Sequence, residues 1–252
     1  MSNDQSASHM PDLQMAIEEL YLVFEPYVLP QFTNPCPCCH KEPDEALLRS
    51  QPLRKLEPRE LSKYVFDALL TWGDSALFRH FLPRIYELMV RPYGPNSLPI
   101  DPEIVLSKLR HGRWREWPVQ EQHAMERFLR ALWHERLGDI VGEGYDYDGE
   151  SETWLCAIAQ AEDVLAPYLS QWLMDTRQTA AEALVAFILR TTIAGSDGMA
   201  RDAFWNGRDA QYTELRRWVV SPEVKMMLQY AADHAVGASR TEVEAALARI
   251  SA

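Results

Sequence analysis

Three cysteines and a histidine crowded near the start of the chain have the side chains best suited to chemistry. They lie in the stretch Cys36-Pro37-Cys38-Cys39-His40. Cys36 and Cys39 have the two-residue spacing that lets two thiolates reach one zinc ion, but a closed zinc site needs a second pair of ligands. The sequence offers no such pair at similar spacing, nor the βαβ setting of a redox motif. We therefore favour a loop of packed thiols over a metal site, and expect no metal and no cofactor.

The sequence lacks the motifs by which common enzymes are detected. It contains no Gly-x-Ser-x-Gly, no His-Glu-x-x-His and no glycine-rich phosphate-binding loop. Nucleophilic catalysis needs a nucleophile beside its base, and glycoside hydrolysis needs carboxylates around one bond. The pairs His134-Glu135 and Asp233-His234 instead fall on helical patterns whose polar faces are typical of solvated surface. We expect a protein that is not an enzyme.

A long polar break at residues 138–151 carries the densest acidic cluster. Residues 139–152 include six carboxylates and no lysine or arginine. The stretch Asp146-x-Asp148-Gly149 echoes half of a calcium loop, but the remaining ligand spacing is missing. Carboxylates around tyrosines suit docking onto a basic surface, because tyrosine gives contact area at low entropy cost and the charges steer association. The other interpretation is a solvated linker. The predicted partner-binding residues are Tyr145, Asp146, Tyr147, Asp148, Glu150 and Glu152.

The net charge of the chain also favours a basic partner. The 252 residues include 25 lysines and arginines and 37 aspartates and glutamates, which gives a net charge of -12. Such a charge repels nucleic acid and anionic membranes and favours a basic partner, although it also simply promotes solubility. The longest apolar run, Ala180 to Ile193, is interrupted by Glu182 and Arg190, so no membrane span is predicted. With no signal sequence at its start and no spaced disulfide framework, the chain is expected in the cytoplasm.

Helical periodicity dominates the chain, and its clearest unit is the helix pair from Glu57 to Val90. An apolar stripe predicts a first helix as far as Trp72, after which Gly73 can adopt a left-handed conformation. Asp74 is predicted to cap a second helix, within which Pro83 forces a kink or a fresh helix start. No sustained alternation of β-branched residues occurs. The predicted fold is all-α, built from stacked antiparallel helix pairs in a HEAT-like or irregular α-bundle arrangement.

The domain organisation follows from the polar breaks. Residues 1–9 are expected to be disordered or an expression remnant, with Met10 as the natural start. Residues 10–137 are predicted to form an N-terminal helical subdomain, residues 138–151 an acidic linker loop and residues 152–252 a C-terminal helical subdomain. The basic and aromatic cluster of Arg113, Trp114, Arg115 and Trp117 is predicted to be a helix junction, with indoles in the core and guanidiniums paired to acids, rather than a nucleic-acid site.

Some stretches of the sequence resemble a known group of proteins. The residues Tyr64 to Leu69, Thr71-Trp72-Gly73-Asp74 and Phe78 to Arg84, following the cysteine cluster, resemble uncharacterised bacterial helical proteins. The likeness covers roughly Cys36 to Trp133. The chain is similar to type VI secretion immunity proteins, in particular to the TsiT type, which neutralises a nuclease effector. The resemblance implies a toxin-binding function and assigns no role to any single residue.

Residues and resemblance together lead to one expected function and two alternatives. The first is a cytoplasmic immunity protein that binds a cognate secreted antibacterial toxin with a basic surface and occludes its active site or substrate groove. The toxin would be a nuclease effector. The alternatives are a zinc-binding metalloprotein centred on Cys36, Cys39 and His40, and a general helical adaptor. Neither nucleic acid nor a membrane is an expected partner, and the sequence leaves the oligomeric state open.

Overall fold

The computed structural model describes residues 12–30, 33, 36–38, 42–91, 96–138, 151–190, 203–234 and 239–251. These ranges contain twelve α-helices and three short 3₁₀ turns. Within them, extended pairing is limited to an isolated bridge between Ala68 and Trp72. The predicted all-α fold is confirmed.

The helices are of short to medium length, and the longest of those described, α6, has 20 residues. In chain order their bounds are α1 Leu13–Val23, α2 Glu42–Leu48, α3 Pro58–Asp67, α4 Ser75–Met89, α5 Pro102–His111, α6 Val119–Gly138, α7 Ser151–Ala161, α8 Ala166–Met174, α9 Gln178–Arg190, α10 Asp209–Val219, α11 Pro222–His234 and α12 Arg240–Ser251. The 3₁₀ turns are η1 Leu53–Lys55, η2 Trp114–Glu116 and η4 Ala203–Trp205.

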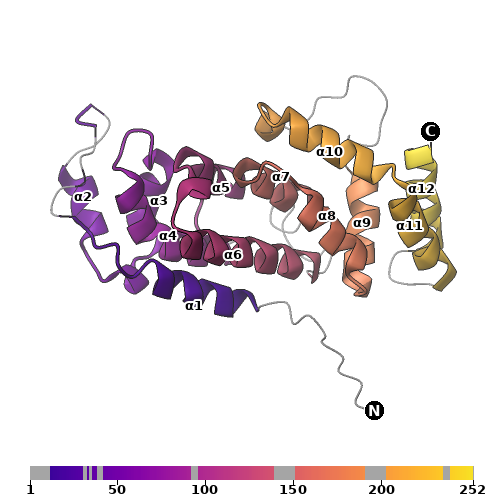
Figure 1. Cartoon of the computed structure of the whole chain (residues 1–252), viewed down its shortest axis with the longest axis horizontal. Helices are drawn as coiled ribbons and strands as arrows, with labels where there is room; N and C mark the ends of the chain where they lie inside the picture. Colours follow the sequence, from indigo (N-terminus) through magenta and orange to yellow (C-terminus); the bar gives the residue numbers. More distant parts are fainter. Residues whose placement is uncertain are drawn as a thin grey trace, which may run out of the picture.

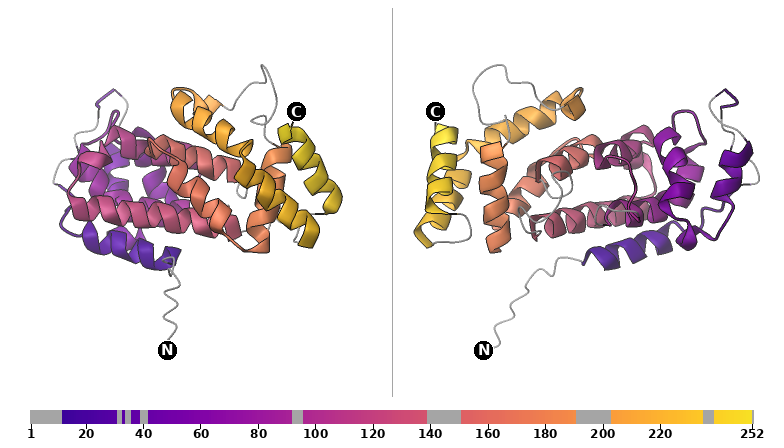
Figure 2. Two further views of the ribbon diagram at one scale, coloured as in Figure 1. Left: turned by 45° about the vertical axis from the view of Figure 1, so that its right-hand side comes forward. Right: turned by 180° about the vertical axis from the view of Figure 1, so that it is seen from behind.

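The chain progresses from one end of an elongated molecule to the other (Figure 1). Helices α2 and α3 lie at one end, α6 runs along the middle with α1 beside it, and α9, α11 and α12 stand at the opposite end. Views from other sides show the same order (Figure 2). Packing also joins helices that are distant in sequence, because α5 contacts α7 and α1 contacts both α4 and α6. None of the described helices is both long and apolar enough to cross a bilayer.

One cluster of buried apolar side chains extends through the molecule, from Leu13 in α1 to Ile250 in α12. Helix α1 contributes an apolar stripe to this cluster, since Ile17 and Leu20 are buried against their neighbours. Burial of such stripes is the main source of helix stability in proteins. The predicted division into two subdomains stays a prediction, because residues 139–150 of the linker lie outside the described ranges. The same holds for the expectation about residues 1–9.

The helix pair around Gly73 differs from its prediction in one respect. Helix α3 ends at Asp67, and the carbonyl of Asp67 accepts hydrogen bonds from the amides of Leu70, Thr71 and Trp72. Leu69 adopts a left-handed conformation with φ 64°. The apolar stripe nevertheless continues to Trp72, which is buried. The loop therefore buries the same side chains that a longer helix would have buried, so periodicity alone could not locate the end of the helix.

The remaining features of this pair follow the prediction more closely. Gly73 has φ 72°, and the carboxylate of Asp74 accepts hydrogen bonds from the amides of Ala76 (3.0 Å) and Leu77 (2.9 Å). Helix α4 continues through Pro83 from Ser75 to Met89, so the alternative of a fresh helix start at this proline is wrong. Proline removes one main-chain hydrogen bond there, and the helix persists because most of its C-terminal half is buried in the core.

The predicted helix junction at residues 113–117 is confirmed. Trp114 and Trp117 are buried, and their indole N–H groups donate to the carbonyls of Ala161 (2.9 Å) and Gly112 (2.7 Å). Arg115 forms ion pairs with two carboxylates, Glu126 and Glu162, and its guanidinium lies over the Trp114 ring. The cluster holds η2 and α6 against the end of α7, and its cations are neutralised within the protein.

A buried lysine beneath the end of α3 makes the stability of the fold depend on pH. The amine of Lys108 in α5 donates to the carbonyl of Phe66 at 2.6 Å. Burial lowers the pKa of Lys108 to about 8, and the negative charge of nearby Asp67 offsets only part of this shift. Between pH 8 and 10.5, the ordinary pKa of a lysine, Lys108 has therefore lost its proton in the folded protein but still carries it in the unfolded chain. Stability must rise with pH across that window.

We expect the free energy of unfolding to increase by about 2 kcal/mol between pH 7.5 and 9.5, and Lys108→Met to abolish this increase. Urea unfolding at fixed ionic strength measures it. Lys55→Met, at an exposed position of η1, serves as the matched control and should retain the increase. The range stays below pH 10, where ordinary tyrosines begin to titrate. An equal increase in wild type and Lys108→Met would show that Lys108 is not responsible.

Candidate functional site

The structure describes little of the predicted partner-binding segment. Tyr145, Asp146, Tyr147, Asp148 and Glu150 lie outside the described residues, and their role stays a prediction. Glu152 is described: it is half-buried in the first turn of α7. A carboxylate in this position interacts favourably with the N-terminal end of the helix dipole. Glu152 therefore has a structural reason for its place in addition to any contact with a partner.

The cysteine cluster is only partly described. Cys36 is half-buried and Cys38 is exposed, whereas Cys39 and His40 lie outside the described residues. Cys156 is buried in α7. Among the residues that the structure describes, no group of three or more histidine, cysteine, aspartate or glutamate side chains is placed to hold a metal ion. The zinc hypothesis for Cys36, Cys39 and His40 thus stays untested.

A groove that the sequence analysis did not identify lies on the surface near the end of α1. It has a volume of about 460 Å³ and is formed by the C-terminal part of α1, the segment after it, η1 and α4. Its buried side includes Phe24 and Pro83, and its exposed side includes Leu22 and Val28, which are 70% and 76% exposed. Volumes of this order suit small ligands or a few side chains of a partner. Exposed apolar side chains around a concave surface are typical of interaction sites.

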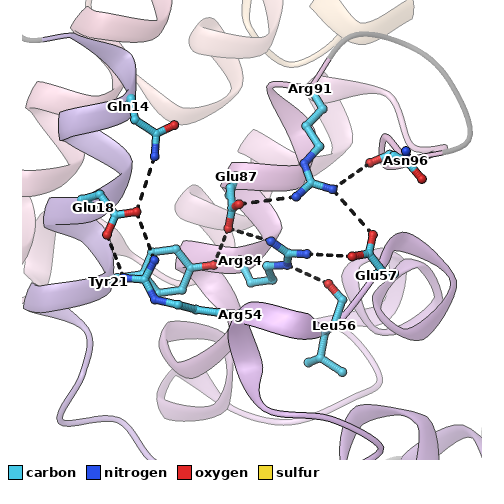
Figure 3. Close-up of polar contacts among 10 residues, drawn as sticks. All are labelled: Gln14, Glu18, Tyr21, Arg54, Leu56, Glu57, Arg84, Glu87, Arg91 and Asn96. Carbon is cyan, nitrogen blue, oxygen red and sulfur yellow. Dashed lines mark hydrogen bonds and ion pairs between the residues drawn. The ribbon is translucent and has the colours of Figure 1, made fainter.

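One aromatic-basic contact and one ion pair form a wall of the groove. Tyr21 and Arg54 both line it, and the guanidinium of Arg54 lies 3.7 Å from the centre of the Tyr21 ring. Both carboxylate oxygens of Glu18 accept hydrogen bonds from Arg54, at 3.0 and 2.8 Å, so the arginine is held in a bidentate pair (Figure 3). This pairing raises the pKa of Arg54 and lowers that of Glu18. This wall therefore presents the Tyr21 ring and a guanidinium whose charge is balanced by Glu18.

Behind this wall, a network of ion pairs joins α1, α3 and α4 (Figure 3). The hydroxyl of Tyr21 donates to Glu87 at 2.6 Å, and Glu87 pairs with Arg84 at 2.8 Å. Arg84 is 3% exposed, and it also donates to the carbonyl of Leu56 (2.7 Å) and pairs with Glu57 (3.3 Å). Burial raises the pKa of the Glu87 carboxyl, but the hydrogen bonds from Tyr21 and Arg84 outweigh it and hold that pKa below its ordinary value. The network fixes Tyr21 and, through it, the shape of the groove.

A second polar cluster supports the opposite side. The hydroxyl of Tyr27 donates to Glu121 at 2.7 Å, and Arg79 contacts both residues, with its guanidinium 4.6 Å from the Trp117 ring. The Nδ1–H of His80 donates to the carbonyl of Tyr27 at 2.7 Å, because a carbonyl oxygen can only accept. Burial lowers the pKa of His80 below its ordinary value, and this hydrogen bond offsets only part of the shift. His80 is therefore neutral at pH 7 and adds no charge to the groove.

The comparisons with known proteins add no further assignment. No family model, curated protein or solved structure matches the chain.

The groove is better suited to binding than to catalysis. Its lining cation, Arg54, is neutralised by Glu18, and its histidine donates its Nδ1 proton to the main chain. The lining carboxylate, Glu25, is exposed at the rim. An apolar side chain could fill the space beside Phe24 and Pro83, and Glu25 would attract a neighbouring cation.

A local sequence signal could have revealed the groove. Leu22 and Val28 are apolar but fall outside the stripe of Leu13, Ile17 and Leu20 that α1 buries. An apolar residue off the core-facing stripe suggests an interaction surface, although single cases are common on ordinary surfaces. Arg54 and His80 could not have been added to the site, because they reach it from other elements through tertiary packing.

Proposed function

We propose that this chain is an immunity protein that binds and neutralises a cognate secreted antibacterial toxin in the cytoplasm. The toxin is a nuclease effector of a type VI secretion system, and binding occludes its active site or substrate groove. The observation that carries the proposal is the net charge of -12, with six carboxylates and no basic residue in residues 139–152. A nuclease presents a basic surface to its substrate, and an acidic protein is complementary to it.

The charges of the groove support a partner of this kind. Glu25 is exposed at its rim, while Arg54 is neutralised by Glu18 and His80 is neutral. The groove is therefore left with a net negative charge beside an apolar surface. We assign it to an apolar side chain of the toxin that lies next to a lysine or arginine on the toxin's basic surface.

Rigidity of the scaffold also supports a binding function. The groove is held from both sides by buried networks, through Arg84 behind Tyr21 and through Arg79 beside Tyr27. Side chains that are already ordered lose less entropy on association, which favours tight binding for a given contact area. A toxin inhibitor needs tight binding, because any toxin that escapes damages the cell that makes it.

Co-purification of the native protein from its bacterium, at low and at raised salt, tests the proposal. We expect a basic protein in stoichiometric amount that is released by salt and degrades nucleic acid once released. A partner without toxic activity would favour the helical adaptor instead. Recovery without a partner but with bound zinc would favour the metalloprotein.

We predict that replacing both exposed apolar groove residues, Leu22→Ser with Val28→Ser, weakens toxin binding by about tenfold or more. Both side chains are exposed in the unbound protein, so the free energy of unfolding should change by no more than about 0.5 kcal/mol. Titration calorimetry with the purified partner measures the affinity. Met226→Ser with Tyr230→Ser removes a similarly exposed apolar pair on α11 and is the matched control. Equal effects of the two double variants would remove the groove from the interface.

A further inference from the structure

Two cysteine sulfur atoms of the N-terminal cluster lie unusually close together. The Sγ atoms of Cys36 and Cys38 are 2.7 Å apart, on either side of Pro37. Cys36 is half-buried and Cys38 is exposed. The structure places Cys36 beside Cys38, whereas Cys39 lies outside the described residues.

The separation of the two sulfur atoms discriminates between the chemistries open to them. Unbonded carbon atoms already stay about 3.5–4.0 Å apart, and sulfur is larger. Two thiolates that share one tetrahedral zinc ion, with bonds of about 2.3 Å, would hold their sulfur atoms about 3.8 Å apart. At 2.7 Å the two sulfur atoms are closer than in either arrangement, and a disulfide bond of about 2.05 Å needs only a short further approach. The separation therefore suits formation of a disulfide between Cys36 and Cys38.

The segment that carries this pair is anchored to the body of the protein. The amide of Cys36 donates to the carbonyl of Thr71 at 2.8 Å. Three residues before Cys36, the buried hydroxyl of Thr33 accepts a hydrogen bond from the indole N–H of Trp72 at 2.8 Å. Both anchors lie on the loop between α3 and α4. Cys36 is thus held in place while Cys38 faces solvent, so the two thiols meet without a large loss of chain entropy.

We propose that Cys36 and Cys38 form a reversible intramolecular disulfide on exposure to a peroxide. The thiolate of Cys38 attacks hydrogen peroxide, the O–O bond breaks, and Cys38 becomes a sulfenic acid with release of one water after protonation. The thiolate of Cys36 then attacks the sulfenic sulfur, the S–S bond forms and a second water leaves. The two sulfur atoms together lose two electrons, which reduce one peroxide to two waters. A thiol reductant restores the pair by exchange.

The test uses the full chain with Cys39→Ser and Cys156→Ser, which retains Cys36 and Cys38 as its only cysteines. The protein is treated with hydrogen peroxide in the presence of a chelator, alkylated without reduction, and weighed intact. We expect a monomer lighter than the reduced form by two hydrogen atoms that takes up no alkylating agent. Treatment with dithiothreitol should restore two alkylation sites. Two alkylated thiols after peroxide treatment, or disulfide-linked dimers alone, would overturn the proposal.

Two controls separate this disulfide from different thiol chemistry that could produce a similar signal. Adding Cys38→Ser leaves Cys36 as the last cysteine, so no intramolecular disulfide can form and Cys36 should stay open to alkylation. A mass loss of two hydrogen atoms in this variant would show that the mass change does not report the disulfide. In wild type, the peptide that ends at Lys41 contains all three clustered cysteines. Its fragment masses should place the bond between Cys36 and Cys38. A bond to Cys39 instead, or protection of Cys36 and Cys38 from alkylation by added zinc, would contradict the assignment.

Discussion

Replacing Arg84 with methionine is expected to lower the free energy of unfolding by about 3 kcal/mol, because it leaves the carbonyl of Leu56 without its donor and removes the buried cation that pairs with Glu57 and Glu87. Arg84 is buried, and its guanidinium serves the carbonyl of Leu56 and the carboxylates of Glu57 and Glu87. Methionine fills similar space but donates no hydrogen bond. This loss lies at the lower end of the range measured when one partner of a buried ion pair is removed, because both carboxylates reach solvent.

Urea unfolding followed by circular dichroism measures the effect of Arg84→Met. Arg240→Met is the matched control, since Arg240 pairs with Glu244 on the exposed face of α12. Such surface pairs contribute about 0–1 kcal/mol. If the two variants lost equal stability, the network behind the groove would be no stronger than a surface ion pair, and the account of a rigid groove would fail.

Trp172→Ala is expected to lower the free energy of unfolding by about 4 kcal/mol, as is usual for deletion of a buried aromatic side chain. Trp172 in α8 is fully buried and contacts Trp133 of α6, Phe187 of α9 and Trp218 of α10 at ring separations of 5.2–5.4 Å. Its indole also donates to the carbonyl of Ala180 at 2.9 Å. The truncation leaves a cavity where four helices meet, and the neighbouring rings cannot all move in to fill it.

The same variant tests whether the chain unfolds as one unit. Because a single buried cluster spans the described helices, loss of Trp172 should shift one cooperative transition, seen alike by tryptophan fluorescence and circular dichroism. Tyr230→Ala, at an exposed position of α11, controls for loss of an aromatic ring and should change stability by less than about 1 kcal/mol. Two separate transitions, with only one shifted by Trp172→Ala, would support two independent subdomains divided near residues 138–151.

Local signals in the sequence were sufficient for the start of α4. Asp74 before Ser75 marks a helix start that the structure confirms, since a side-chain cap acts through neighbouring main-chain groups. The end of α3 was not predictable in this way. The loop from Ala68 to Trp72 is held by the contact of Trp72 with Thr33, thirty-nine positions earlier in the chain.

The candidate groove depends still more on tertiary structure. Leu22 and Val28 could be noticed as apolar residues outside the buried stripe, but Arg54 and His80 join them through packing of η1 and α4 on α1. The sequence indicates charge and composition, and these suggested a basic partner. It does not indicate which distant elements lie together. The acidic segment remains a sequence prediction, because residues 139–150 lie outside the described ranges.

The affinity of the purified toxin for a loop variant tests the central proposal most directly. The variant is Asp146→Asn with Asp148→Asn and Glu150→Gln, and titration calorimetry at low salt compares it with wild type. A control with the same loss of charge, Glu135→Gln with Asp233→Asn and Glu244→Gln, neutralises exposed carboxylates on α6, α11 and α12. We predict that the loop variant binds about tenfold more weakly or worse, and the control within about threefold of wild type. Equal affinities for all three proteins would contradict the acidic docking surface on which the proposed function rests.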